Sequence, residues 1–251
     1  MKVFYHDDFR QVYVSDPAAA PGRIEAIVAA IKNEVTFEEP LPAGADDIEA
    51  IHSSYHIKYV TRQGLYNISA LAAGGAIQAA VTGLSEPSFA LIRPPGHHAS
   101  ADSCWGFCYF NNMSISLDHL KRNGLINQAY VLDFDLHYGD GNVNILQDKG
   151  YVTILNPESH ARKHYLAEVE AGLAQAEVDI IGVSAGFDNH VQDWGGLLET
   201  EDYQTMAGLV MSLLDRLPMI GDRLEFDGWQ MTVKAVEERR VTRVLLVREA
   251  A

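Results

Sequence analysis

The chain has 251 residues, of which 47% are hydrophobic and 21% charged, so it can bury the core of one large domain or two small ones and is not a disordered tail. Its 34 acidic and 19 basic side chains give a net charge of −15, which argues against nucleic acid or an anionic membrane as the main partner, because both require a basic surface. Two cysteines provide no disulfide framework, and no stretch is apolar for long enough to span a membrane. The acidic start is unlike a signal peptide, so we expect a soluble cytoplasmic protein.

Short apolar runs alternate with helical patterns over most of the chain. The runs predict buried strands at residues 88–92, 128–134, 151–155 and 178–184. Helical spacing is found at residues 68–81, 112–122 and 164–177. Continuous apolar strands between helices are typical of an open, mostly parallel α/β sheet with helices on both faces. In such sheets the ligand site forms beyond the carboxyl ends of the strands.

The first polar cluster, Arg93-Pro94-Pro95-Gly96-His97-His98, follows the first of these strands. Two adjacent imidazoles are costly to bury when both are charged, so we expect one to be neutral and the other to lie near a carboxylate. That division can supply a general base together with an acid or electrostatic partner. The alternative is a surface histidine pair on a turn made rigid by the prolines.

The second cluster, residues 133–141, follows the next strand. Asp133, Asp135 and His137 alternate, so on an extended segment they project to the same side. Aspartate oxygens with an imidazole nitrogen suit a divalent metal such as Zn²⁺ or Fe²⁺. A polar loop with an Asp-Gly turn, Asp140-Gly141, is the alternative.

The third cluster, residues 184–190, follows the strand at 178–184, and its Asp188 is placed to complete a metal site begun by Asp135 and His137. Residues 182–186 also match the Gly-x-Ser-x-Gly turn of serine hydrolases around Ser184. Those enzymes require a histidine far downstream, and the last one here is His190. We therefore interpret Ser184 as a small residue at a tight turn.

The last part of the chain has a different character. Residues 216–251 contain seven basic and six acidic side chains and no histidine, whereas residues 1–215 have a balance of −16. Residues 223–233 alternate with period two around Asp227-Gly228, and a second alternating run spans residues 241–247. This pattern predicts a β-hairpin and a further strand.

Taken in order, the clusters resemble the histone deacetylase and acetylpolyamine amidohydrolase family over about residues 1–200. Residues 106–112 (Gly-Phe-Cys-Tyr-Phe-Asn-Asn) and 193–197 (Asp-Trp-Gly-Gly-Leu) add to the resemblance, with weaker similarity at residues 21–23 and 52–60. The resemblance implies an arginase-like α/β fold. From about residue 202 the chain resembles the transporter-associated domain of CorC/HlyC-type proteins, through residues 217–222, 226–229 and 239–241. We therefore predict a deacetylase-like domain at residues 1–201 and a small β-rich tail at 202–251, which is either a fused transporter-associated-type fragment or a divergent family terminus.

The resemblance also implies the roles of individual residues. The metal ligands would be Asp135, His137 and Asp188, the catalytic pair His97 and His98, their carboxylate partners Asp133 and Asp140, and the substrate channel Gly106 and Phe107. The metal would be zinc, with iron as the alternative. A monovalent cation often lies behind this metal in the family, but Leu155 stands where a serine is frequent.

One departure from the family bears on activity. Members usually carry a Gly-Gly-Tyr segment on a late strand, and its phenol helps to stabilise the oxyanion. No such segment follows Asp188, where the only tyrosine is Tyr203, so we expect a deacetylase sheet that lacks its last strands, exposes an edge and favours oligomers.

The sequence is compatible with three candidate functions. The first is a metal-dependent deacetylase acting on acyl-lysine or acylpolyamine, whose activity the missing Gly-Gly-Tyr segment would lower. The second is a weak or inert binder of the same acylated amines. The third, an arginase-like dinuclear hydrolase, requires further aspartate ligands, and residues 188–190 offer only one.

Overall fold

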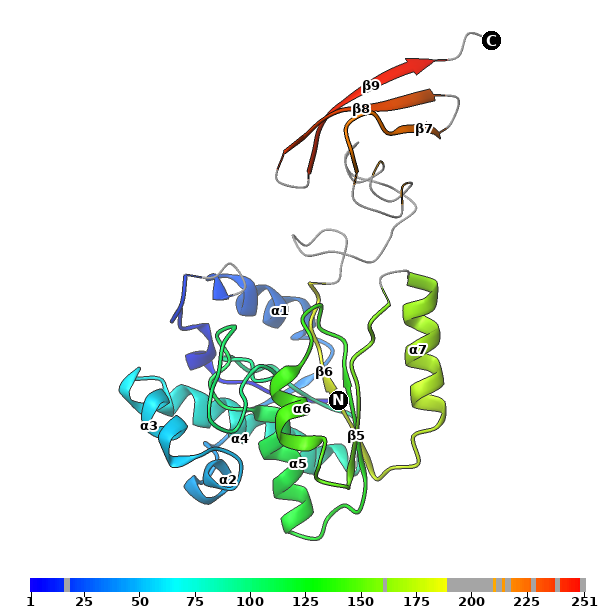
Figure 1. Ribbon diagram of the computed structural model, residues 1–251. Coiled ribbons are helices and arrows are strands. Elements are labelled where there is room, and N and C mark those ends of the chain that lie inside the picture. Colours follow the sequence, from blue (N-terminus) through cyan, green and yellow to red (C-terminus); the bar gives the residue numbers. More distant parts are fainter. Residues whose placement is uncertain are drawn as a thin grey trace. The chain divides into compact units, whose positions relative to one another are not determined.

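The computed structural model describes residues 1–15, 19–159, 162–188, 210, 214, 218–226, 229–237 and 240–248 (Figure 1). The chain divides into two compact units. One comprises residues 1–159 and 163–196, and the other residues 160–162 and 197–251.

The strands of the first unit form two parallel three-stranded sheets. Strands β1 (Lys2–Phe4), β2 (Thr36–Glu38) and β3 (Ser88–Ala90) lie in the order β2-β1-β3, and β4 (Ala129–Asp133), β5 (Val152–Leu155) and β6 (Ile180–Ser184) in the order β5-β4-β6. The four predicted strands correspond to β3, β4, β5 and β6. Strands β1 and β2 were not predicted because, unlike β3, neither lies within one of the apolar runs of the sequence.

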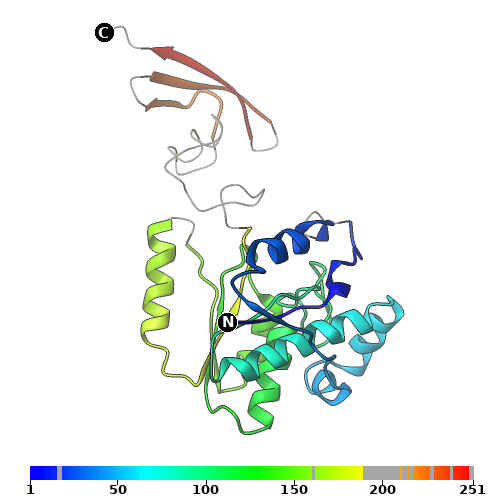
Figure 2. The same ribbon diagram turned by 180° about the vertical axis from the view of Figure 1, so that it is seen from behind.

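Helices pack against both faces of the second sheet (Figures 1 and 2). The helices of this unit are η1 (Asp7–Arg10, a 3-10 helix), α1 (Arg23–Ile31), α2 (Ala45–Glu49), α3 (Ser54–Arg62), α4 (Tyr66–Gly83), α5 (Asn112–Arg122), α6 (Asp140–Leu146) and α7 (Arg162–Ala174). Gly172 of α7 lies against Tyr130 of β4, whereas Gly182 of β6 lies against Met113 of α5. Because neighbouring residues of a strand face opposite sides, α7 and α5 cover opposite faces. Helices α4, α5 and α7 confirm the helical patterns, within two or three residues at their ends.

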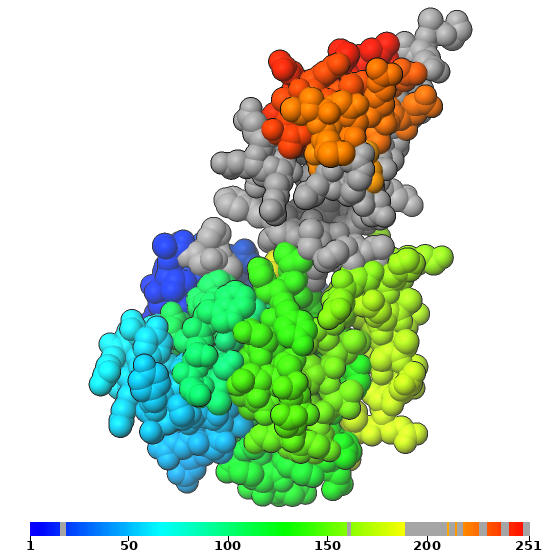
Figure 3. All heavy atoms as spheres, in the orientation of Figure 1, coloured from blue at the N-terminus to red at the C-terminus, as the bar shows by residue number. Residues whose placement is uncertain are grey.

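The main core lies between α4, α5 and β4. Its fully buried members include Val60, Ala73, Ile115, Leu117, Leu120, Val131 and Leu146. The Ala- and Gly-rich sequence of α4 permits close packing: a Cβ atom on Gly74 would collide with the backbone of residues 41–43. Strand β4 is buried along its whole length because it is the central strand of its sheet and α5 and α7 cover its opposite faces. Figure 3 shows the face of this unit on which side chains from α3 (cyan) through α6 (green) to α7 (yellow-green) reach the surface.

Strand β6 departs from the expectation that both faces of every strand are covered. Ile181 and Val183 are 46% and 49% exposed, and both face the side of the sheet that carries α7. Among the described residues, β3 and β6 each pair with only one neighbour. Within the described part of the chain, the β3 and β6 edges of the two three-stranded sheets therefore have no strand partner.

The second unit contains an antiparallel sheet of β7 (Arg223–Phe226), β8 (Trp229–Glu237) and β9 (Arg240–Arg248) in the order β7-β8-β9. Phe226 is the register partner of Trp229 in an antiparallel pair, as the hairpin pattern predicts. Its core contains Val210, Met231, Val233 and Val241. The predicted hairpin and the third strand are confirmed.

No helix within the described residues is both long and apolar enough to cross a membrane.

Candidate metal centre and histidine pair

The carboxyl ends of β4 and β6 bring two distant parts of the sequence together. Asp133 and Ser184 are register partners at the ends of these neighbouring parallel strands, and the backbone N–H of Phe134 donates to Ser184 O at 3.1 Å. The loop after β4 carries Asp135 and His137, and the segment after β6 carries Asp188. A Cβ atom on Gly186 would collide with the Asp135 carboxylate, so a glycine permits the close approach of the two segments.

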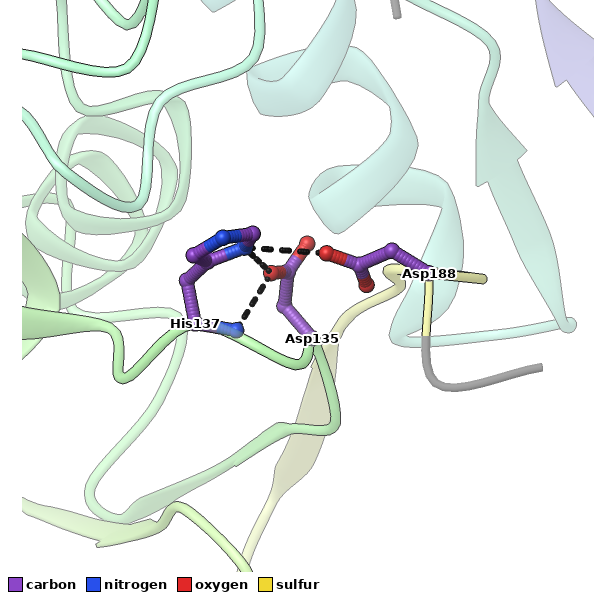
Figure 4. A group of neighbouring side chains, drawn as sticks. All are labelled: Asp135, His137 and Asp188. Atoms are coloured by element: carbon purple, nitrogen blue, oxygen red, sulfur yellow. Dashed lines mark hydrogen bonds and ion pairs between the residues drawn. The ribbon is translucent and has the colours of Figure 1, made fainter. Parts of the chain in front are cut away.

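Asp135, His137 and Asp188 converge at this edge (Figure 4). Each offers one ligand atom within 4.8 Å of the other two. His137 Nδ1 lies 2.9 Å from Asp188 Oδ2 and 3.2 Å from Asp135 Oδ1. The His137 side chain is 56% exposed, so solvent reaches the group.

The donor set fits a divalent cation. Burial, together with the neighbouring Asp188 carboxylate, raises the pKa of Asp135, although His97 and the hydrogen bonds from His137 act in the opposite direction. Two carboxylates that face each other in a partly buried site repel, and a cation between them relieves that repulsion. Two carboxylate oxygens and one imidazole nitrogen are ligands that zinc and iron accept.

His97 and His98 follow β3 in a turn that is tied to its surroundings on both sides. The buried Arg93 guanidinium donates to the carbonyl oxygens of Phe9 at 2.9 Å and Gln11 at 3.0 Å. On the other side, the Asn112 side chain at the start of α5 donates to Pro94 O at 3.0 Å. These bonds fix the direction in which the two imidazoles project.

Each imidazole of the pair has a carboxylate at its Nδ1 atom. His97 Nδ1 lies 3.2 Å from Asp133 Oδ2, and His98 Nδ1 lies 2.7 Å from Asp140 Oδ1. Asp133 is fully buried and also accepts a hydrogen bond from the Asn142 side chain at 2.8 Å. His97 Nε2 is 3.9 Å from Asp135 Oδ2, so the pair adjoins the candidate metal centre.

The surroundings shift the pKa values of the two imidazoles in opposite directions. Burial opposes protonation of His97, but the hydrogen bond and the negative charge of Asp133 outweigh it and raise the pKa of His97. Burial lowers the pKa of His98, and the adjacent His97 adds to this effect against the hydrogen bond with Asp140. Histidines with separated pKa values can divide the acid and base roles between them.

The segment 105–107 lies against His98. Gly106 and Phe107 have φ angles of +56° and +50°, and a Cβ atom on Gly106 would lie 2.7 Å from His98 Cδ2. Gly106 therefore adjoins the histidine pair. Sequence reasoning missed Trp105, whose ring stacks on His98; the one available signal was its position directly before Gly106.

The remaining sequence-predicted residues lie outside this cluster or outside the described residues. Tyr138 is half-exposed and lines an open hollow between α6 and β5 with Val143 and Asn156. Leu155 is partly buried against α7 and has no side-chain oxygen for a monovalent cation. His190, residues 193–197 and Tyr203 lie outside the described residues.

Known proteins resemble both parts of the chain. The Probable deacetylase of Methanothermobacter thermautotrophicus is 39% identical over 156 residues, which cover 53% of this chain and 47% of that protein. Polyamine deacetylase HDAC10 of Homo sapiens is 32% identical over 108 residues, which cover 42% of this chain and 16% of that protein. The chain thus spans less than half the length of either relative.

A solved structure confirms the deacetylase-like fold. The crystal structure of the HDA15 HD domain superposes with a TM-score of 0.69 at 20% identity, covering 79% of this chain and 76% of that one. Residues 189–250 match the transporter associated domain, as the resemblance of the tail implies. Residues 18–165, more than half of the chain, match the histone deacetylase domain, and the chain therefore belongs to the histone deacetylase domain family.

Proposed function

We propose that this protein is a metal-dependent deacetylase that hydrolyses the amide of an acylated amine, either acyl-lysine or an acylpolyamine. The single observation that carries the proposal is the convergence of the Asp135, His137 and Asp188 group with two carboxylate-linked histidines at one sheet edge. Membership of the deacetylase family and the names of the relatives support the reaction class.

The geometry supports the following roles for these residues. A divalent metal, zinc or iron, held by Asp135, His137 and Asp188 would supply Lewis-acid polarisation of the amide carbonyl and would acidify water. His98 takes the proton of the attacking water and returns it to the leaving amine, since its Nδ1 is engaged by Asp140 and burial favours its neutral form. His97, held by Asp133, supplies positive charge beside the reacting carbonyl.

We propose the same division of the chain as the sequence predicts, with residues 1–201 as the deacetylase domain and 202–251 as the tail. The division into compact units near residue 196 supports a boundary in this region. Gly106 and Phe107 would line the substrate channel, because Gly106 adjoins His98.

Turnover of a fluorogenic acetyl-lysine amide, and of acetylated polyamines, with added Zn²⁺ or Fe²⁺ tests the proposal. We expect slow hydrolysis by the full chain and none by His98→Ala, whereas His164→Ala, which removes an exposed histidine of α7, retains the wild-type rate. Equal turnover by His98→Ala and the wild type contradicts the proposed roles.

The missing Gly-Gly-Tyr segment favours one second candidate, a binder of acylated amines without useful turnover. This candidate predicts that the metal-loaded protein binds an acetyl-lysine peptide in calorimetry, that Asp188→Ala removes this binding, and that no acetate is released.

A further inference from the structure

Two rings enclose the imidazole of His98. The His97 ring centroid lies 3.9 Å from that of His98 with an interplanar angle of 38°, and the Trp105 centroid lies 3.6 Å away at 27°. If the rings of His97 and Trp105 lay on the same face of His98, they would overlap with each other at these distances and angles. They therefore lie on opposite faces of the His98 ring. His98 is accordingly only 4% exposed.

Trp105 also shares the carboxylate that holds His98. Its indole Nε1–H donates to Asp140 Oδ2 at 2.9 Å, while Asp140 Oδ1 accepts from His98 Nδ1 at 2.7 Å. Each carboxylate oxygen thus has its own donor, which prevents the carboxylate from turning away. Burial opposes ionisation of Asp140, but the hydrogen bonds from Trp105 and His98 outweigh it and lower the pKa of this carboxyl.

The backbone that carries Trp105 is clamped at both ends by buried histidines outside the candidate site. His52 Nδ1–H donates to Ser100 O at 3.0 Å, and His52 Nε2 accepts from the Asn111 N–H at 2.9 Å. His56 Nε2 lies 2.7 Å from Tyr109 O. With Gly106 tight against His98, the segment 100–111 holds the indole in one place.

We propose that Trp105 is a positioning residue for hydrolysis: it fixes the His98–Asp140 pair in its working orientation and shields the His98 ring from water. The inference rests on the proposed function, in which His98 transfers the proton. Trp105 itself is 51% exposed, so its outer surface separates the histidine from solvent. A hydrogen-bonded partner that orients a histidine commonly contributes about 10–100-fold to activity.

The first measurement needs no turnover. Diethyl pyrocarbonate modifies accessible neutral imidazoles, and mass spectrometry of the digested full-length protein locates each modified histidine. We expect His98 to react several-fold faster in Trp105→Leu than in the wild type, with His119 and His164 as internal references. Tyr55→Leu, which removes a 72%-exposed aromatic ring of α3, is the matched control and leaves His98 unchanged. An unchanged His98 rate in Trp105→Leu overturns the shielding role.

The second measurement separates orientation from packing. Trp105→Phe keeps an aromatic ring over His98 and removes the N–H donor. We expect kcat to fall about 10-fold or more with KM and the melting temperature close to wild type. A wild-type kcat in this folded variant overturns the positioning role. If the wild type itself shows no turnover, the proposed function fails, while the modification rates still decide whether Trp105 shields His98.

Discussion

Asp133 of β4 and Ser184 of β6 are register partners at the ends of neighbouring parallel strands, and this pairing assembles the candidate site. Asp135 stands two residues beyond the first partner and Asp188 four beyond the second. The Leu136 N–H donates to Asp188 Oδ1 at 3.0 Å, so the two segments stay together beyond the sheet. Residues more than fifty positions apart thereby supply one group of candidate metal ligands.

The first prediction concerns the metal. Asp135→Ala and Asp188→Ala each remove one of three convergent candidate ligands, so we expect neither variant to retain stoichiometric metal in elemental analysis after purification. Asp102→Ala, which removes an exposed carboxylate, serves as the control and retains the metal. Full occupancy in both ligand variants would falsify the assignment.

The second prediction concerns stability in acid. Burial, with a contribution from the adjacent His56, lowers the pKa of His52 to about 3. An unfolded histidine titrates near 6.5, so the folded state loses stability relative to the unfolded state as the pH falls from 6.5 towards 3, by up to about 1.4 kcal/mol per pH unit. We expect His52→Asn to cost about 1–3 kcal/mol at pH 7 and to flatten this dependence.

Urea unfolding at pH 7 and pH 5 measures both effects. His164→Asn, on the exposed side of α7, is the control and should follow the wild type at both pH values. An equal loss of unfolding free energy between pH 7 and pH 5 in the wild type and His52→Asn would show that His52 titrates normally in the folded state.

The third prediction concerns the substrate's charge. Residues 1–215 have a formal net charge of −16, so we expect a cationic acyl-amine to be attracted electrostatically. Its kcat/KM should fall as salt rises from low to physiological concentration, more steeply than that of a neutral analogue, because salt screens charges beyond about 10 Å. Parallel salt dependence for the two substrates rules out steering.

The fourth prediction concerns the missing phenol. An oxyanion donor is worth about 10²–10³ in rate, so replacing residues 202–251 with a Gly-Gly-Tyr strand and helix of the family type should raise kcat by about that factor. Oligomeric state is compared in the same experiment by light scattering. A monodisperse, monomeric wild type that already matches the graft would mean that another group performs the role, and Tyr138→Phe and Tyr203→Phe then identify it.

The fifth prediction concerns the exposed face of β6. Ile181 and Val183 present apolar surface on β6, a strand whose outer edge has no partner among the described residues, and such a surface favours association. The double variant Ile181→Thr, Val183→Thr keeps β-branched side chains and should reduce concentration-dependent association in sedimentation velocity, with little change in melting temperature. Val131→Thr makes the same chemical change at a fully buried position, where an unsatisfied hydroxyl should cost about 1–3 kcal/mol.

The sequence by itself determined the features that depend on neighbouring residues. The apolar runs around Val131 and Ile181 predict strands because a short continuous apolar run is typical of a strand covered on both faces, and the alternation after residue 223 predicts the antiparallel tail because a half-exposed strand has period two. The order of the three polar clusters was sufficient to identify the family. The alternation of Asp133, Asp135 and His137 was sufficient to predict a metal-binding loop.

Only the tertiary structure decided which distant residues meet. The register between β4 and β6 brings Asp188 to Asp135, and no local pattern encodes that register. The division into two three-stranded sheets and the exposure of Ile181 and Val183 depend on which elements cover them. The sequence did not indicate Trp105 as a site residue. Its contacts with His98 and Asp140 depend on the fold of the segment 100–111, which the buried His52 holds through Asn111. Local sequence selects strands, helices and turns, whereas long-range packing selects their partners.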